Sequence, residues 1–125
     1  GNFRSKAERR VHTISKKAFE KSSPSILISR NEYLFDSFES DIVLRVPIPV
    51  SSCQSGSVTM NIEVDGIHHN RERNKRFCML RDKYLKSQGV IVERIKISSL
   101  RMNDLKLEKW LSDKVVNASR YFVSH

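Results

Sequence analysis

The feature that most constrains the fold is an extended run, a long helical run and a second extended run in close succession. Val58–Val64 alternates apolar and polar residues, which is typical of a strand with one buried face. Arg71–Ser87 has the pattern of a helix that ends at Gly89, and Val90–Ile95 is a second, β-branched strand. Two strands joined through a single helix run parallel, with a right-handed crossover. This unit predicts an α/β fold.

The residues before this unit predict a helix and further extended chain. Ser5–Lys21 carries apolar residues three and four positions apart, and Ser5 and Glu8 have the spacing of a capping box. Ser25–Ser29 and Tyr33–Phe38 are short apolar runs separated by polar residues. We interpret them as a strand and a turn that leads into a second extended segment.

One more strand and one more helix complete the predicted order. Asp41–Val46 is rich in β-branched residues, and a hairpin with a long connection would pair it with Val58–Val64. We expect Pro47 and Pro49 to end it, because proline cannot donate a hydrogen bond inside a sheet. A final helix spans about Leu105–Phe122. The order is therefore helix, three strands, helix, strand, helix.

A single domain accounts for residues 1–125. No stretch approaches the roughly 18–20 apolar residues of a membrane span, so we expect no membrane partner. Because the chain begins with Gly-Asn and not with Met, we expect it to be a piece of a longer protein, with residues 1–4 a linker or a remnant. Cys53 and Cys78 lack the spacing of metal ligands and indicate reduced thiols in a reducing compartment.

The charge of the chain favours a polyanionic partner. Lysine and arginine total 23 against 14 acidic residues, a net charge of +9. Phosphate backbones attract such an excess through the release of counterions. Many of these basic residues lie in the predicted helix at 71–87. The basic residues expected to contact nucleic acid there are Arg71, Arg73, Lys75, Arg76, Arg81, Lys83 and Lys86.

The same helix carries an apolar stripe. We expect Phe77, Leu80 and Tyr84 to face the core, with Leu85 beside them, because they recur at helical spacing. Base stacking on aromatic side chains is the alternative use of these rings. We interpret Cys78 as a core or interface residue in the same way.

Acidic residues gather on the strand that precedes this helix. Glu63 and Asp65 share one face of the strand, because the side-chain period is two. Neighbouring carboxylates favour a cation or a proton between them, and Mg²⁺ or Mn²⁺ binds such oxygen pairs. His68 and His69 follow at the carboxyl edge of the sheet, where ligands gather in α/β folds.

Two further acids join this candidate cluster. The predicted hairpin would bring Asp41 near Glu63. Glu8 is interpreted first as the acid of a capping box and second as a metal ligand. Asp41, in turn, has the alternative of a pairing with Arg45. The sequence thus offers up to four carboxylates from three separate elements.

The motifs in this region resemble those of a known family. Ile62-Glu-Val-Asp-Gly-Ile-His-His69, a basic helix with Lys75-Arg76, and Tyr84-Leu-Lys-Ser-Gln-Gly-Val-Ile-Val-Glu-Arg-Ile95 are similar to the RAP domain, an RNA-binding module abundant in apicomplexans. The resemblance covers about Glu39 to Val116. It implies a restriction-endonuclease-like αβββαβ core with a mixed sheet and an added C-terminal helix. It also implies kinship with the very-short-patch-repair-like branch of the PD-(D/E)XK nucleases.

The resemblance also implies residue roles and a setting. It assigns catalytic roles to Asp41, Glu63, Asp65 and His69, with Asp41 and Glu63 as ligands of Mg²⁺ or Mn²⁺. Glu8 and His68 are additional candidates. A mitochondrial or plastid protein that processes RNA, with other RNA-processing proteins as partners, is the implied context.

One departure from the nuclease pattern keeps the alternatives open. The pattern D/E-x-K places lysine where this chain has Asp65, and Lys75, Lys83 or Lys86 would have to replace it. The first hypothesis is a metal-dependent endoribonuclease that hydrolyses single-stranded or structured RNA. The second is a non-catalytic RNA-binding or protein-docking module, whose acids pair with arginine. A repair-type DNA endonuclease is the third.

Overall fold

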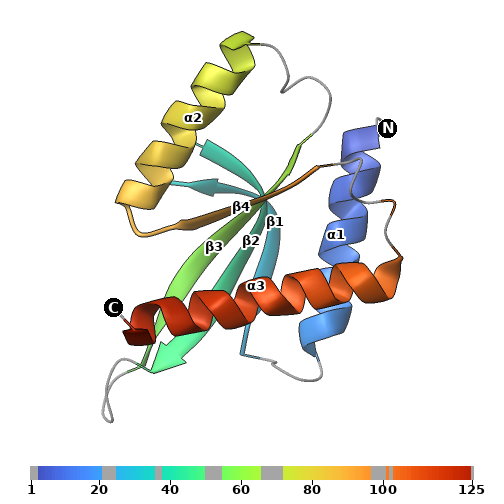
Figure 1. Ribbon diagram of the computed structural model, residues 1–125, viewed down its shortest axis with the longest axis vertical. Helices are drawn as coiled ribbons and strands as arrows, with labels where there is room; N and C mark the ends of the chain where they lie inside the picture. The colour runs from blue at the N-terminus through green and yellow to red at the C-terminus, as the bar shows by residue number, and fades with distance from the viewer. Residues whose placement is uncertain are drawn as a thin grey trace.

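The chain folds into one four-stranded sheet with helices on both faces (Figure 1). The computed structural model describes residues 3–20, 25–35, 38–49, 55–65, 72–96, 101 and 103–124. Its elements are α1 (Phe3–Glu20), β1 (Leu27–Leu34), β2 (Phe38–Pro49), β3 (Ser55–Asp65), α2 (Glu72–Ser87), β4 (Ile91–Lys96) and α3 (Asp104–Ser124). None of the described helices combines the length and apolar character that a bilayer crossing requires.

The sheet has the order β1-β2-β3-β4 and is mixed. β1, β2 and β3 pair antiparallel, whereas β4 runs parallel to β3 through the crossover helix α2. The predicted hairpin, the parallel pair and the order of the elements are therefore confirmed, and the chain belongs to the α/β class.

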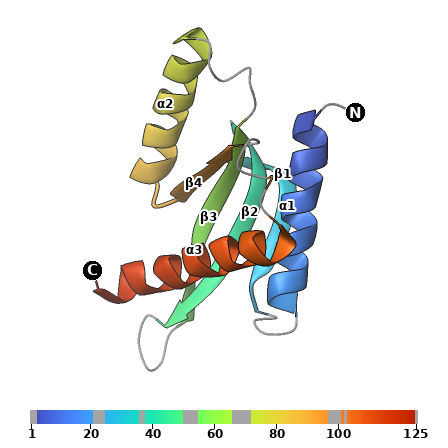
Figure 2. The ribbon, with the colours of Figure 1, turned by 45° about the vertical axis from the view of Figure 1, so that its right-hand side comes forward.

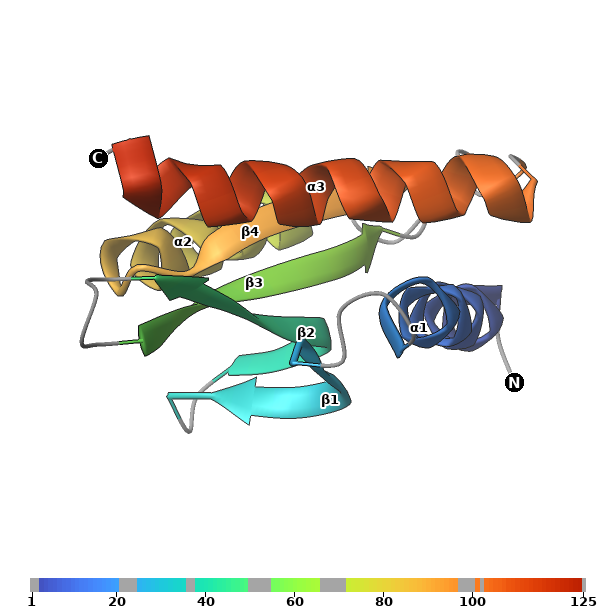
Figure 3. The same ribbon diagram turned by 90° about the horizontal axis from the view of Figure 1, so that it is seen from below.

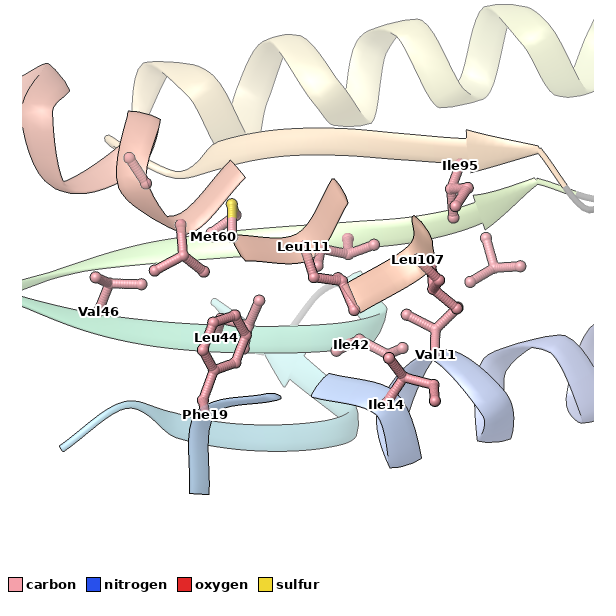
Figure 4. Packing of buried hydrophobic residues seen from close by; sticks show 14 of the residues in the cluster. Val11, Ile14, Phe19, Ile42, Leu44, Val46, Met60, Ile95, Leu107 and Leu111 are labelled. Atoms are coloured by element: carbon pink, nitrogen blue, oxygen red, sulfur yellow. The ribbon is translucent and has the colours of Figure 1, made fainter. Parts of the chain in front are cut away.

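The main core lies between the sheet and the helices α1 and α3. Ile42 of β2 and Met60 of β3 belong to this core, together with Val11 of α1 and Leu111 of α3 (Figure 4). The ribbon shows α1 and α3 crossing on this side, with α2 on the other (Figures 2 and 3). A smaller cluster around Val43 and Leu85 packs on the α2 face.

The beginning of the chain differs from its prediction in two ways. α1 already begins at Phe3, so residues 3 and 4 belong to the helix and Ser5 lies inside it and not at its cap. β1 is one strand across the polar residues that were expected to divide it. Asn31 in its middle has a φ of 56°, which interrupts the alternation of faces. Before it Ile28 packs against the main core, and after it Leu34 joins the cluster on the α2 face.

The two prolines do not end β2, contrary to the prediction. Pro47 and Pro49 remain in the strand and lie opposite Ser57 and Ser55 of β3. β1 pairs with β2 only as far as Arg45, so beyond that residue one side of β2 has no strand beside it among the described residues. Proline is tolerated at an edge, because no neighbouring strand needs its missing N–H.

The end of α2 is closed by Gly89, as predicted. Gly89 has a φ of 83°, and its N–H donates to the carbonyl of Lys86 at 3.0 Å. The N–H of Val90 donates to the carbonyl of Leu85 at 3.0 Å. This pair of bonds is the Schellman arrangement, which turns the chain directly into β4.

Replacement of Gly89 by alanine should lower the free energy of unfolding by about 1 kcal/mol, because a Cβ disfavours the left-handed conformation. Apart from Gly89 and its two chain neighbours, no atom of the described residues lies within 4 Å of the added Cβ, so the loss comes from the backbone. Chemical denaturation measures it. Gly89→Asn should lose less, because asparagine tolerates this conformation better. An alanine variant as stable as the parent would contradict the left-handed helix end.

Candidate functional site

The register of β2 and β3 brings two distant carboxyl groups together. Ile42 pairs with Ile62 and Val43 with Asn61, so the same register sets Asp41 across from Glu63. Both acids lie on the face that α2 covers, where Asp41 is 4% exposed and Glu63 is 2% exposed. Their carboxyl groups are hydrogen-bonded to each other. The predicted approach of Asp41 to Glu63 is therefore present in the fold.

Two hydrogen-bond donors and one guanidinium surround this carboxyl pair. The backbone N–H of Val64 donates to Oδ2 of Asp41 at 2.9 Å. Nδ2 of Asn61 donates to Oε1 of Glu63 at 3.0 Å, and Nη2 of Arg81 lies 3.0 Å from the same oxygen. Asn61 and Arg81 were not expected at this site. The two-residue spacing of Asn61 and Glu63 on β3 could have indicated the first of them.

The environment favours a proton on Glu63. Burial, together with the hydrogen bond and the negative charge of Asp41, raises the pKa of Glu63 to about 7. The charge of Arg81 and the hydrogen bond from Asn61 act in the opposite direction and lower it. Near neutral pH Glu63 is therefore protonated for part of the time, and the protonated carboxyl group donates a hydrogen bond to Asp41.

Arg81 sets the rotation of α2 about its own axis. It is 8% exposed and occupies the buried stripe of the helix with Cys78 and Leu85. The prediction that Phe77, Leu80 and Tyr84 face the core is wrong, because these side chains are 57%, 63% and 42% exposed. The helix must be rotated so that the guanidinium of Arg81 faces Glu63. The same rotation exposes the side chains of Phe77, Leu80 and Tyr84 to solvent.

A second arginine holds α2 against the sheet. Arg94 of β4 donates from Nε and Nη2 to both carboxylate oxygens of Asp82, with distances of 2.6 to 3.0 Å. Such a two-pronged contact fixes both position and orientation. Asp82 is the only acid between residues 76 and 87, and it is committed to Arg94.

Some polar atoms of the site lack hydrogen bonds among the described residues. They are Oδ1 of Asn61 and both Nε and Nη2 of Arg81, all of which are buried. Nη2 is close enough to Glu63 for an ion pair but lacks the alignment of a hydrogen bond. The site is thus compact and charge-compensated, but its hydrogen bonding is incomplete.

The other predicted site residues are distributed as follows. Glu8 is buried on α1, and its Oε2 lies 3.7 Å from Nη2 of Arg30 on β1. Asp65 is the last residue of β3, and its backbone pairs with Lys96. The residues whose side chains lie outside the described part of the structure are Asp65, His68, His69, Arg71, Arg73 and Lys75.

Three of the predicted phosphate-contacting residues are exposed on α2: Arg76, Lys83 and Lys86. Arg81 was expected among them, but the structure buries it against Glu63. With Asp82 committed to Arg94, the solvent-facing surface of α2 between residues 76 and 87 is basic and apolar.

The described residues do not fit a divalent ion as they stand. Within the described ranges, no three histidine, cysteine, aspartate or glutamate side chains form a group that could hold a metal. Asp41 and Glu63 supply only two carboxyl groups, and these two groups are hydrogen-bonded to each other. The guanidinium of Arg81 already places a positive charge 3.0 Å from Glu63, where it would repel a cation.

No family model matches this chain, and neither a curated protein nor a solved structure shows significant similarity to it.

Replacement of Glu63 by glutamine should change the pH dependence of stability. The folded protein keeps a proton on Glu63 that the unfolded chain releases above a pH of about 4.5. The free energy of unfolding of the parent should therefore fall, relative to the Glu63→Gln variant, as the pH rises from about 4.5 through about 7. The fall is up to roughly 3 kcal/mol, since one pKa unit is worth about 1.4 kcal/mol.

Denaturant unfolding of both proteins across this pH range measures the effect. Asp113→Asn, which removes an exposed carboxyl group of α3, should follow the parent at every pH. A difference between the parent and Glu63→Gln that stays constant with pH would show that Glu63 does not carry the proton.

Proposed function

We propose that this chain is an RNA-binding domain with a restriction-endonuclease-like core, in which the carboxyl pair is neutralised from within the fold and does not cleave RNA. The observation that carries the proposal is the separation of charge at α2. The acids Asp41 and Glu63 are sealed beneath the helix, while Arg76, Lys83 and Lys86 project from it into solvent. In the described stretch 76–87 the fully exposed charged side chains are all basic, and a polyanion that approaches α2 meets them first.

The topology supports the nuclease-like core. A helix, three antiparallel strands, a crossover helix and a parallel fourth strand follow the order αβββαβ, and α3 is added after it. The carboxyl pair lies on two adjacent strands at the centre of this sheet. The resemblance to the RAP domain between Ile62 and Ile95 favours RNA over DNA and an organellar RNA-processing protein as the parent.

Compensation of the buried negative charges by groups of the protein itself favours a domain that does not catalyse cleavage. Arg81 supplies the positive charge that a metal ion would otherwise supply beside Glu63. With a pKa raised to about 7, Glu63 is also protonated for part of the time near neutral pH, which removes a further negative charge. Removal of one partner of a buried ion pair strongly destabilises the folded protein, because the other charge is left uncompensated. These acids therefore have a structural role even if they catalyse no reaction.

A second candidate function is metal-dependent cleavage of RNA. The observation that favours it is the meeting of Asp41 and Glu63, which come from separate strands and lie 22 residues apart in the sequence. Displacement of the proton on Glu63 and of Arg81 would be required before Mg²⁺ or Mn²⁺ could bind. The two candidates therefore differ in one measurable property, the response to these ions.

Removal of the exposed positive charges of α2 should weaken RNA binding in a salt-dependent manner. For the triple variant Arg76→Ala, Lys83→Ala, Lys86→Ala, the plot of log affinity against log salt should become less steep by about 2, at about 0.7 per lost phosphate contact. Fluorescence anisotropy with labelled RNA at several salt concentrations measures the slope.

A matched control removes the same charge elsewhere. Arg101, Lys106 and Lys109 are exposed at and before α3, which packs on the other face of the sheet. Their replacement by alanine should leave the slope nearly unchanged. Equal losses in the two triple variants would mean that net charge alone attracts RNA and that α2 is not the binding surface.

Mg²⁺ and Mn²⁺ should neither raise the melting temperature of the domain nor induce cleavage of RNA. The test incubates the parent, Asp41→Asn and Glu63→Gln with labelled single-stranded RNA, duplex RNA and duplex DNA at one salt concentration. Thermal unfolding is followed with and without each ion. Ion-dependent cleavage by the parent that both substitutions abolish would reject the non-catalytic form and establish the second candidate.

A further inference from the structure

Aromatic side chains and one leucine, most of them exposed, lie at the surface of α2 and at the adjoining end of the sheet, outside the carboxyl site. The group consists of Phe35, Phe38, Phe77, Leu80 and Tyr84, and we refer to it as the aromatic platform. Ring centroids lie 5.9 Å apart for Phe35 and Tyr84, 5.6 Å for Phe38 and Tyr84, and 6.4 Å for Phe38 and Phe77. The β1–β2 end of the sheet and α2 thus contribute to one continuous surface.

The platform is anchored from below and open above. Phe38 is partly buried and packs on the cluster of Val43 and Leu85 beneath α2. Phe77, Leu80 and Tyr84 recur at positions i, i+3 and i+7 and are exposed. Large apolar side chains gathered on the solvent side of a helix are typical of a binding surface, whereas single ones are not.

The backbone at the edge of the platform is held in an unfavourable conformation. Phe35 has a φ of 55°, in the left-handed region that bulky residues rarely adopt. Its ring is exposed and meets Tyr84 edge to face. Strained residues of this kind concentrate at binding sites, where the surrounding structure holds them in place.

Positive charge runs beside the platform. Arg76 and Lys83 are seven residues apart on α2 and form the helical row next to Leu80. Both side chains are exposed. Aromatic faces next to a row of cations are the combination that holds single-stranded nucleic acid, because unpaired bases stack on the rings while phosphates meet the charges.

We propose that the aromatic platform binds unpaired bases of single-stranded RNA, which stack on Phe77 and Tyr84 while Arg76 and Lys83 contact the phosphates. This inference rests on the proposed RNA-binding function and names the form of RNA that is bound. A second copy of the chain fits the surface less well. Face-to-face packing would bring the rows of Arg76 and Lys83 together in a protein with a net charge of +9.

The test compares three ligands of equal length by fluorescence anisotropy at one salt concentration. They are single-stranded RNA, an RNA backbone without bases, and duplex RNA. The variants are Phe77→Leu and Tyr84→Leu, which keep apolar volume and remove the aromatic face. Each should weaken binding of single-stranded RNA about fivefold or more and leave binding of the base-free backbone unchanged. Met79→Leu, at an exposed position on another side of α2, is the control and should match the parent.

A spectroscopic measurement makes the test independent of affinity. Tyr84→Trp places a fluorophore on the platform, and single-stranded RNA should quench its emission whereas the base-free backbone should not. Trp110 lies on α3 and packs against the core on the other face, so the parent gives its background.

The outcomes separate this inference from the proposed function. If the parent binds none of the three ligands, both fail. If it binds the base-free backbone as tightly as single-stranded RNA and neither leucine variant differs from it, RNA binding by charge stands and base stacking is rejected. If the leucine variants abolish self-association in sedimentation and leave RNA affinity unchanged, the platform is a contact between copies and the inference is also rejected.

Discussion

The contact between Arg81 and Glu63 is the interaction on which the arrangement of this domain depends. Glu63 lies at the centre of the sheet and is almost fully buried, next to a second acid. Two carboxyl groups in such a place require compensation, and the fold supplies it with a proton on Glu63 and one guanidinium. Because the guanidinium belongs to α2, the charge of the buried acids is compensated only when the helix is placed with Arg81 toward the sheet.

The composition of the exposed surface of α2 follows from the placement of Arg81 against Glu63. With Cys78, Arg81 and Leu85 turned toward the sheet, the neighbouring stripe of the helix faces solvent. That stripe carries the larger apolar side chains, and the exposed cations lie next to it. The ion pair of Asp82 and Arg94 ties the helix to β4 and removes the nearest acid from this surface. The carboxyl pair thus shapes the proposed RNA-binding surface without contact with RNA.

Much of the architecture could be predicted, because it depends on local patterns. The alternation in β3, the crossover through α2 and the helix end at Gly89 each follow from a few neighbouring residues. The approach of Asp41 to Glu63 follows from hairpin pairing and a period of two. Pro47 and Pro49 were misjudged because their tolerance depends on where β1 stops, which is a property of another strand. The two-residue spacing places Asn61 on the same face as Glu63, but only the burial of Glu63 makes a hydrogen bond from Asn61 necessary.

By itself, the sequence determined the α/β class, the antiparallel pairing of β2 with β3, the parallel pairing of β3 with β4 and the approach of Asp41 to Glu63. These properties arise from side-chain periodicity and from the geometry of short connections. Only the tertiary structure decided which stripe of α2 is buried. Hydrophobicity favours Phe77, Leu80 and Tyr84, whereas the native fold buries Arg81, since a carboxyl pair from two other elements needs a nearby positive charge. A helix viewed alone contains no information about the charge of the surface that it covers.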